Sequence, residues 1–382
     1  NLQISKKTSL WLTVITIGMI GAVYAIFGGL KTIALTDTIN GAGLLIIGLL
    51  IPIIALYDIG DGQIFKGLGM VYDHDPSKFD LVSDEPSFGP GSRSAILPFS
   101  VLFTGLVINQ LYFWAMHQSI IQRVLGAANL KEAQKGLLYT GVLKILIPLI
   151  VVLPGIIGFY YFGESLIGEQ DSVYPALVKK VLPPWMTGLF IAVIIGAVFS
   201  TFNSVLNSAA TVFSIDIYKP FLNKSANDLE MVKTGKSVSI ILAVGSIVIA
   251  PFVANAPDGL YQLLQQLNGI FFIPMASVII AGFLCPYVSA RGAKAGLIFG
   301  LIFYISMNFV FKVDLHFVHI WGLEFLLNLV IMHIVSMIYK VDKAFSIRDI
   351  GVVNMKPWGM AKTFALMLIV ITILIYVLLG NN

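Results

Sequence analysis

The sequence has little charge and almost no cysteine. Asp, Glu, Lys and Arg make up 12% of its 382 residues, about half the share that is usual in a soluble domain. Its one cysteine, Cys285, excludes a disulfide framework and a metal site built from cysteines. The net charge is only +4, and the basic residues lie in short loops rather than in a stripe. This distribution argues against nucleic-acid binding.

Catalytic patterns are also missing from the sequence. It contains no nucleophile paired with a base, no phosphate-binding glycine loop and no carboxylate pair placed for acid–base chemistry. His316 and His319 have no third ligand nearby, which favours an interfacial position over a metal site. We therefore expect neither an enzyme nor a transition-metal centre.

Hydrophobic residues, in contrast, make up 57% of the chain, and its mean hydropathy is +0.89. One soluble core could not hide that much apolar surface, whereas a run of about 20 apolar residues crosses a bilayer as a helix. The sequence predicts an all-α, polytopic membrane protein with about ten transmembrane helices, at 8–30, 38–57, 95–117, 136–161, 185–215, 234–256, 260–285, 295–311, 317–339 and 360–379.

The basic residues predict how these helices cross the membrane. Fifteen Lys and Arg side chains fall in segments on one side and eight on the other, with Lys144 inside a helix. The positive-inside rule then places residue 1 outside the cell and makes the acidic segment 58–94 an extracellular loop. Because the first residue is Asn rather than Met, we expect that an N-terminal part of the protein precedes this sequence.

The uncharged run from Thr187 to Ile215 carries a polar cluster, VFSTFNSVLNSAA, at its centre. At helical spacing its serines form one stripe and its asparagines a second. Small polar residues allow close helix packing, and serines bond their own helix. The alternative is a cation site, because hydroxyl and carbonyl oxygens suit a hard ion such as Na⁺. Its ligands would be Ser200, Thr201 and the carbonyl of Ala197.

Three further polar positions lie at membrane depth, where such groups usually face a cavity or a partner. Asn109 and Gln110 precede Tyr112, Phe113 and Trp114, a combination that suits a polyhydroxylated ligand as well as it suits an aromatic belt. Lys144 either snorkels towards the membrane surface or donates to a ligand in a wet cavity. The segment GLYQLLQQLNG, at 259–269, predicts a polar helix half that can break beside a cavity.

Several of these segments resemble the solute:sodium symporter family, and most closely its bacterial and animal sodium/glucose–galactose cotransporters. The similar stretches are GGLKTIALTDTIN (28–40), NQLYFWAMHQSIIQRVLGAANLKEAQKGLLYTGVLKILIPLIVVLPG (109–155) and VFSTFNSVLNSAATVFSIDIYKP (198–220). The patterns Q-x-x-x-Q-R at 118–123 and N-S-A-x-T-x-F-x-x-D-I-Y at 207–218 are specific to the family. Lys144 and the Q-x-x-Q of 262–265 point to its sugar branch.

The resemblance implies the inverted-repeat, leucine-transporter-like fold. The ten helices are then core helices 4 to 10 followed by three accessory ones. Residues 1–57 end the first repeat, 58–94 form the extracellular loop, 95–285 form the second repeat, and 286–382 form the C-terminal accessory helices.

The resemblance also implies roles for single residues. The main sodium site takes Ala197, Ser200 and Thr201; a possible second sodium or coupling site takes Asp37 and Ser204; the substrate contacts are Gln110, Lys144 and Gln265; and the gates are Phe113, Trp114 and Tyr261. At position 203, where members of the family have a small residue, this sequence has Asn. Gln110 replaces Asn or Thr, and Phe113 replaces Tyr, which leaves the exact substrate open.

The implied function is sodium-coupled symport of a hexose-like sugar by alternating access, without nucleic acid or any metal other than Na⁺. The partners are the sugar, the sodium ion and the lipid bilayer. The implied location is the plasma membrane, which is the inner membrane in a bacterium. Two alternatives remain open: another small polar solute such as an inositol or a sugar acid, and a sugar sensor or sodium leak on the same fold.

Overall fold

The computed structural model describes residues 5–80, 98–166, 170–253, 260–341 and 351–380, and all regular structure in them is helical. The chain forms two compact units, each from two separate stretches. Unit 1 contains residues Asn1–Phe79 and Thr140–Leu260, and unit 2 contains Asp80–Tyr139 and Tyr261–Asn382. The repeat boundaries expected from the sequence are different and stay a prediction.

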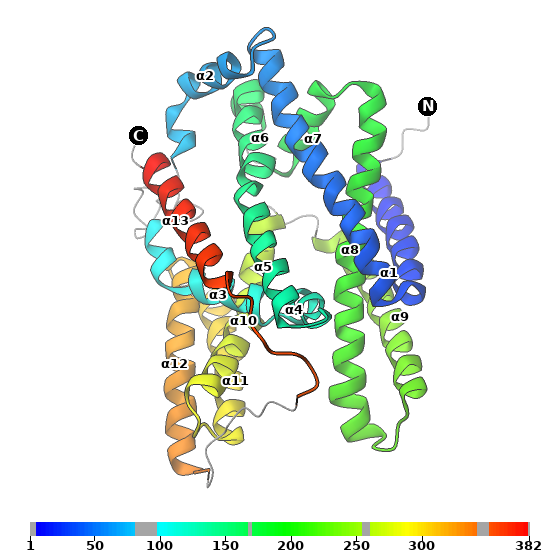
Figure 1. The fold of residues 1–382 in the computed structure, drawn as a ribbon, viewed down its shortest axis with the longest axis vertical. Coiled ribbons are helices and arrows are strands. Elements are labelled where there is room, and N and C mark those ends of the chain that lie inside the picture. Colours follow the sequence, from blue (N-terminus) through cyan, green and yellow to red (C-terminus); the bar gives the residue numbers. More distant parts are fainter. Residues whose placement is uncertain (1–4, 81–97, 167–169, 254–259, 342–350, 381–382) are drawn as a thin grey trace. The chain divides into compact units, whose positions relative to one another are not determined.

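Unit 1 is built around the first helix and α8 (Figure 1). Its helices are α1 (Lys6–Ile59), α2 (Ile64–His74), η1 (Pro76–Phe79), α6 (Ile147–Phe162), η3 (Gly163–Leu166), α7 (Gln170–Val181), α8 (Pro184–Val212), the π-helical η4 (Phe213–Leu222) and α9 (Asp228–Val253).

Helix α1 has 54 residues and would measure about 80 Å if it were straight. It reverses direction instead, as its dark-blue and lighter-blue parts show in Figure 1. The hydroxyls of Tyr24 and Thr36 are hydrogen-bonded, although twelve residues of straight helix would separate them by about 18 Å. The two parts contain the candidate spans Thr8–Ile26 and Leu35–Ile59, which confirms the two helices expected at 8–30 and 38–57.

The second part of α1 packs into an apolar core with α6, α7 and the start of α8. The fully buried side chains of this core include Ile51, Ile157 and Leu177. A Cβ at Gly48 would lie only 2.4 Å from Ile150, so the missing side chain lets α1 and α6 approach closely. Small residues commonly allow such contact between helices in lipid, where no hydrophobic force pushes them together.

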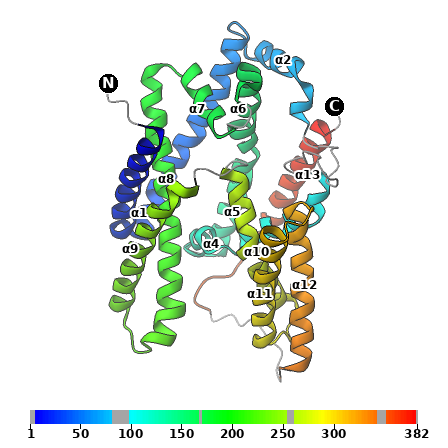
Figure 2. The same ribbon diagram turned by 180° about the vertical axis from the view of Figure 1, so that it is seen from behind.

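Unit 2 contains η2 (Phe99–Phe103), α3 (Gly105–Ala115), α4 (Gln118–Leu125), the first part of α5 (Leu130–Ile145), α10 (Leu260–Leu284), α11 (Ala290–Ile305), the π-helical η5 (Ser306–Val310), α12 (Phe317–Ile338) and α13 (Ala361–Leu379). Figures 1 and 2 both show α11 and α12 side by side. Gly296 and Gly300 of α11 face Met332 and Asn328 of α12 at distances that would leave no room for a Cβ.

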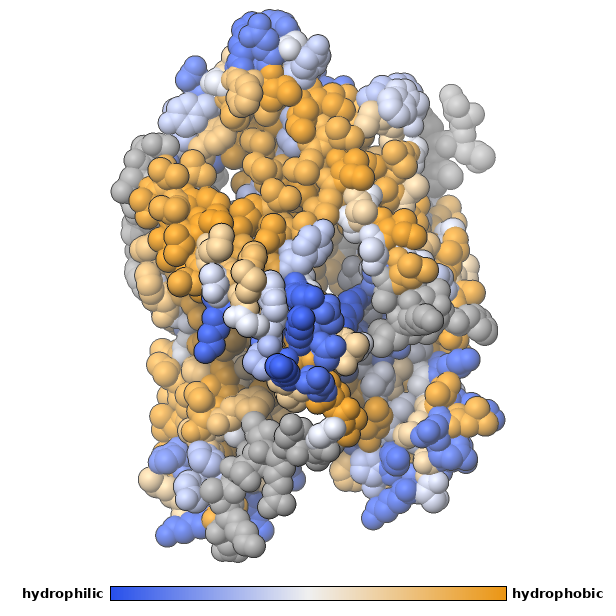
Figure 3. Space-filling view, in the orientation of Figure 1, coloured by the Kyte–Doolittle hydropathy of each residue, from blue (hydrophilic) through white to orange (hydrophobic). Residues whose placement is uncertain are grey.

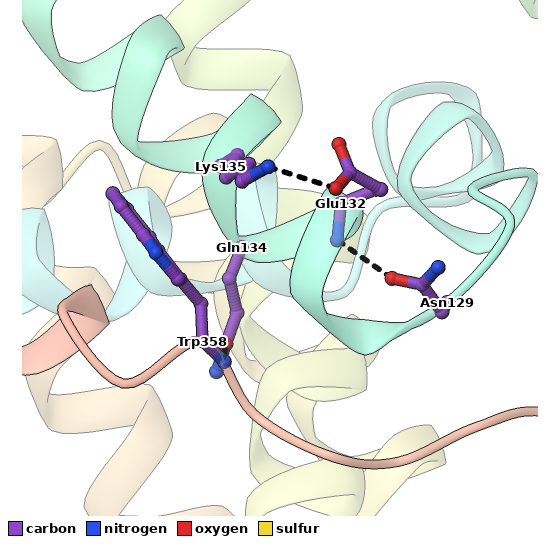
Figure 4. Close-up of polar contacts among 5 residues, drawn as sticks. All are labelled: Asn129, Glu132, Gln134, Lys135 and Trp358. Atoms are coloured by element: carbon purple, nitrogen blue, oxygen red, sulfur yellow. Dashed lines mark hydrogen bonds and ion pairs between the residues drawn. The ribbon is translucent and has the colours of Figure 1, made fainter.

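The chain that leads to α13 is fixed to the start of α5 (Figure 4). The side chain of Asn129 accepts from the backbone N–H of Glu132, which caps the helix, and Lys135 pairs with Glu132 at 2.9 Å. Gln134 accepts from the backbone N–H of Trp358 at 2.7 Å. The segment just before α13 is therefore tied by hydrogen bonds to a polar segment of unit 2.

Nine stretches of the described residues are long and apolar enough to span a membrane, against about ten expected. The expected helix at 95–117 is the one that differs. Its described part is η2 followed by α3, whose eleven residues reach only about 16 Å. The backbone leaves the helix at Thr104, and again at Met116 and His117. Mean hydropathy over a run does not reveal such breaks.

The expected helix at 136–161 is divided into α5 and α6 at Leu146. Pro148 has no N–H to donate to the carbonyl of Lys144, four residues earlier, and this weakens the helix at that point. Together the two helices still form one candidate span, Leu130–Phe162.

Hydrophobic side chains cover the faces expected to meet lipid. In Figure 3 the visible surfaces of α6 and of α13 are mostly orange, that is, hydrophobic. None of the most apolar residues of α13 is buried within the protein, so this helix is stable only in an apolar surrounding such as the bilayer.

Candidate sodium and substrate sites

The expected sodium ligands lie together on α8, in unit 1. The helix begins after Pro183, with Pro184 in its first turn, where the missing N–H is not needed. Ala197 and Ser200 are half-buried and Thr201 is exposed. The backbone carbonyl of Ser200 accepts from the Ser204 hydroxyl at 2.7 Å. The Ala197 carbonyl and the hydroxyls of Ser200 and Thr201, three oxygen atoms that could coordinate a cation, thus lie within a little over one turn. The Ser204 hydroxyl, in contrast, is hydrogen-bonded to its own helix.

The packing of α1 on α8 places Asp37 at the same level. The side-chain amide of Asn40 donates to the carbonyl of Gly196 at 3.1 Å, and Gly43 lies against Val193. These two contacts are three residues apart on each helix, and the numbering rises along α1 as it falls along α8, so the two helices are antiparallel here. Continuing the register by one turn brings Asp37, which is half-buried, to the level of Phe199 and Ser200.

Asn203 is the most buried polar residue of this region. Its side chain is 0% exposed, and neither its oxygen nor its nitrogen has a hydrogen-bond partner among the described residues. A buried amide without partners is costly. The residue that the sequence marks as a departure from the family is thus also one whose polar atoms lack partners.

Two of the expected substrate contacts lie in unit 2, on α3 and α10. Gln110 is exposed, and its side-chain oxygen accepts from the indole N–H of Trp114 at 3.0 Å. Phe113 contacts Trp114 and stacks on His117, with ring centroids 5.0 and 5.8 Å apart. It also faces Phe272 of α10 at 6.3 Å. Two of the three expected gate rings, Phe113 and Trp114, therefore belong to one aromatic cluster between α3 and α10.

Gln265 is half-buried on α10, where its side-chain oxygen accepts from Asn268 at 3.0 Å. Tyr261 is exposed one turn earlier. Helix α10 is continuous from Leu260 to Leu284, with Pro274 inside it, so the polar half expected to break is helical here.

The third expected substrate contact, Lys144, belongs to unit 1. It is exposed in the last turn of α5 rather than about two turns inside a longer helix. A positive charge near a helix C-terminus interacts favourably with the helix dipole. The interruption at Pro148 thus gives Lys144 a position that periodicity alone did not predict.

Sequence reasoning missed a buried polar group on α12. Glu324 and Asn328 are both 0% exposed, one turn apart on α12. The signal was present in the sequence, because Glu324 is the one charged residue in the apolar run 317–338, and such residues are rare and functional in membranes.

Comparison with known proteins identifies the family. Residues 2–300 match the Sodium:solute symporter family. The chain belongs to this family. Its membership confirms the resemblance found in the α8 and 109–155 segments.

Known symporters of the family align over most of the chain. The chain is 40% identical over 362 residues to the uncharacterized symporter YidK of Escherichia coli (strain K12). This alignment covers 95% of the chain and 62% of that protein. It is 28% identical to the sodium/glucose cotransporter of Vibrio parahaemolyticus, over 78% of the chain and 57% of that protein. The sodium/glucose cotransporter 1 of Ovis aries is also 28% identical, over 80% of the chain and 50% of that protein. The chain thus spans half to just under two thirds of these relatives' length.

A solved structure shares the fold. The chain is similar to a Na⁺-coupled sialic acid symporter in a substrate-bound, outward-open state, with a TM-score of 0.71 and 21% identity over 88% of the chain and 68% of that structure. With the nine candidate spans, this likeness confirms an all-helical, multi-pass membrane protein with the leucine-transporter-like fold.

Proposed function

We propose that the protein is a Na⁺-coupled symporter that carries a hexose-like sugar into the cell by alternating access. The observation that carries the proposal is the oxygen-rich turn of α8, Ala197, Ser200 and Thr201, in a chain of the sodium:solute symporter family. Relatives named sodium/glucose cotransporters support the sugar. The protein would act in the plasma membrane, the inner membrane of a bacterium, and no chemical step is part of this function.

Sodium would bind first, at the Ser200 and Thr201 hydroxyls and the Ala197 carbonyl, and would stabilise the outward-facing state. Its entry along the membrane potential supplies about 2.3 kcal/mol per 100 mV. Asp37 lies at the level of Ser200 by the register of α1 and α8. We propose it, with Ser204, as the coupling or second sodium site.

Sugar hydroxyls would then bond to Gln110, Lys144 and Gln265, while rings of Phe113, Trp114 and Tyr261 close the site. Amides with adjacent aromatic faces suit this ligand class because hydroxyls need donors and acceptors and the C–H face needs apolar contact. The aromatic cluster of α3 and α10 supports this assignment. The substrate would leave inward once one repeat, within 1–57 or 95–285, rocks against the other.

The double substitution Ser200→Ala and Thr201→Ala in the full-length protein tests the sodium assignment. We expect Na⁺-driven uptake into proteoliposomes to be abolished at ordinary Na⁺ concentrations, because two oxygen ligands are lost while the helix keeps its propensity. Substitution of Ser246 and Thr372 by Ala is the matched control, since both hydroxyls only bond their own helices. Normal uptake by the double variant would reject the site.

A competition panel tests the substrate. We expect hexoses to inhibit uptake of a labelled hexose, and an inositol or a sugar acid to inhibit weakly. Gln110 and Phe113, which depart from the family's residues, favour the second candidate, another small polar solute. If no hexose competes, that second function replaces the first. Sodium-dependent binding of sugar without concentrative uptake would instead identify a sensor or a leak.

A further inference from the structure

Helix α12 contains one acidic residue, Glu324, which is completely buried within unit 2. Neither carboxyl oxygen has a hydrogen-bond partner among the described residues, and no ion pair of that part of the chain includes Glu324. A carboxylate buried without a cation or donors is strongly unfavourable, above all at membrane depth. The folded protein must therefore neutralise this charge.

The surroundings of Glu324 are closely packed and polar. One turn further along α12, Asn328 donates to the hydroxyl of Ser277 on α10 at 3.3 Å. Tyr304 of α11 is buried and donates to the carbonyl of Gln266 on α10 at 2.8 Å. Glycines at positions 269 and 300 let these helices touch. The site is thus enclosed by α10, α11 and α12.

No positive side chain of the packed helices reaches this position. On α11 the charged residues are Arg291, whose guanidinium lies over the ring of Tyr339, and Lys294. They are at least ten residues before Tyr304, about 15 Å along the helix. Helices α3, α10 and η5 carry no charge; Tyr112 and Tyr261 are their titratable groups.

The remaining titratable groups of α12 lie near its ends. His319 faces the hydroxyls of Ser100 and Thr104, His316 stacks on Phe317, and His333 lies beyond Asn328. Tyr304 is the titratable group of these helices close enough to interact electrostatically with Glu324, and its hydroxyl already donates to the carbonyl of Gln266.

The hydrogen-bonding atoms next to Glu324 lack one donor. Asn328, four residues later, has a buried side-chain oxygen without a partner among the described residues. Residues at this spacing lie on the same face of a helix. One proton on Glu324 supplies this donor, because the new O–H can donate to the side-chain oxygen of Asn328.

We propose that Glu324 is a proton-binding site of the accessory helices, in which the proton is shared with the side-chain oxygen of Asn328. By neutralising the carboxylate, the proton allows α12 to bury Glu324 against its neighbours, and it gives Asn328, which also bonds Ser277 of α10, a second partner. The site belongs to unit 2, whereas the expected sodium ligands of α8 belong to unit 1, and the proposal does not depend on which solute is carried.

Thermal unfolding of the purified full-length protein at constant Na⁺ tests the proposal. The folded protein holds the proton and the unfolded chain releases it near neutral pH, so stability falls as the pH rises. From about pH 7 to about pH 9, below the range where Lys and Tyr ordinarily titrate, we expect the wild-type midpoint to fall by about 3 °C or more. E324Q keeps a donor and an acceptor without a charge, and its midpoint should not change over this range.

The control is E132Q, which removes an exposed carboxylate of the same unit and should keep the wild-type pH dependence. Equal pH dependence in wild type and E324Q overturns the proposal. So does a melting midpoint of the S200A/T201A variant that still changes with Na⁺ at constant pH, because the occupant would then be sodium.

Infrared spectra decide the case in which E324Q does not fold. At about pH 8, where ordinary carboxyl groups are ionised, the wild type should show a carboxylic-acid C=O band that shifts in N328A because its acceptor is lost. Absence of that band, or a band that N328A leaves in place, overturns the proposal.

Discussion

Single glycines decide how closely the helices of unit 2 approach. At Gly269 on α10 an added Cβ would lie 2.1 Å from the indole nitrogen of Trp321 and 2.4 Å from the ring of Tyr304. Both rings are completely buried and have no room to move. At Gly282, on the same helix, an added Cβ would meet nothing within 4 Å.

We predict that Gly269→Ala destabilises the protein by about 1–3 kcal/mol, the usual cost of overpacking a tight core. Gly282→Ala should be neutral or stabilising by less than about 1 kcal/mol, because alanine is the better helix former. Thermal unfolding of the two variants in detergent measures the difference. Equal midpoints would mean that the α10–α12 contact is looser than the structure has it.

Residue types alone did not tell which polar side chains are buried. Asn203 and Glu324 are both fully buried without partners among the described residues, while Gln110, expected to contact the substrate, and Tyr261, expected at the gate, are exposed. Burial depends on which helices cover a residue, and one sequence gives the periodicity of each helix but not its neighbours.

At the scale of helices, the contact between α1 and α8 positions the sodium ligands. Asn40 bonds the Gly196 carbonyl, one residue before Ala197, and Tyr24 and Thr36 close the reversal of α1. Both bonds lie within unit 1. The alignment of Asp37 with Ser200 therefore depends on a few polar contacts between apolar helices.

We predict that Asn40→Ala lowers the apparent Na⁺ affinity of uptake and costs about 0.6 kcal/mol of stability, the average for a hydrogen bond between helices in a membrane. The cause is a looser register of α1 on α8. Na⁺ titration of uptake, together with thermal unfolding, measures both effects. Ile39→Ala, at a position that is 65% exposed, is the control and should leave the Na⁺ affinity unchanged; an equal loss there would contradict the role of Asn40.

Helix breaks are the part of the fold that hydropathy predicted least well. The run 95–117 has the hydropathy of a span, yet η2 and α3 divide it, and Pro148 divides 136–161. Proline gives a local chemical reason for the second break. The first depends on Gly105 being held against Val318 and Trp321 of α12, a contact between residues more than 200 positions apart.

At the scale of the whole molecule, the proposed function requires that sodium and solute favour the same state. The free energy of coupling is then shared by the two sites, so each ligand changes the affinity of the other by one factor. This reciprocity distinguishes a coupled symporter from a leak, in which sodium passes without regard to solute.

We predict that saturating Na⁺ raises the solute affinity of the full-length protein by the same factor by which saturating solute raises Na⁺ affinity, about 5- to 150-fold for typical coupling. Equilibrium binding of each ligand, with the other present or replaced, measures the two factors. Unequal factors would indicate a further ligand that was not controlled, and factors of one would reject coupling at equilibrium.

The sequence by itself determined the class of the protein. Its low charge and long apolar runs require a bilayer, and the α8 and 109–155 segments identify the symporter family, because these properties are local to each segment. Tertiary structure alone decided the reversal of α1, the register that aligns Asp37 with Ser200, and the enclosure of Glu324. Each of these depends on contacts between distant segments, and the free energy of such contacts cannot be read from either segment separately.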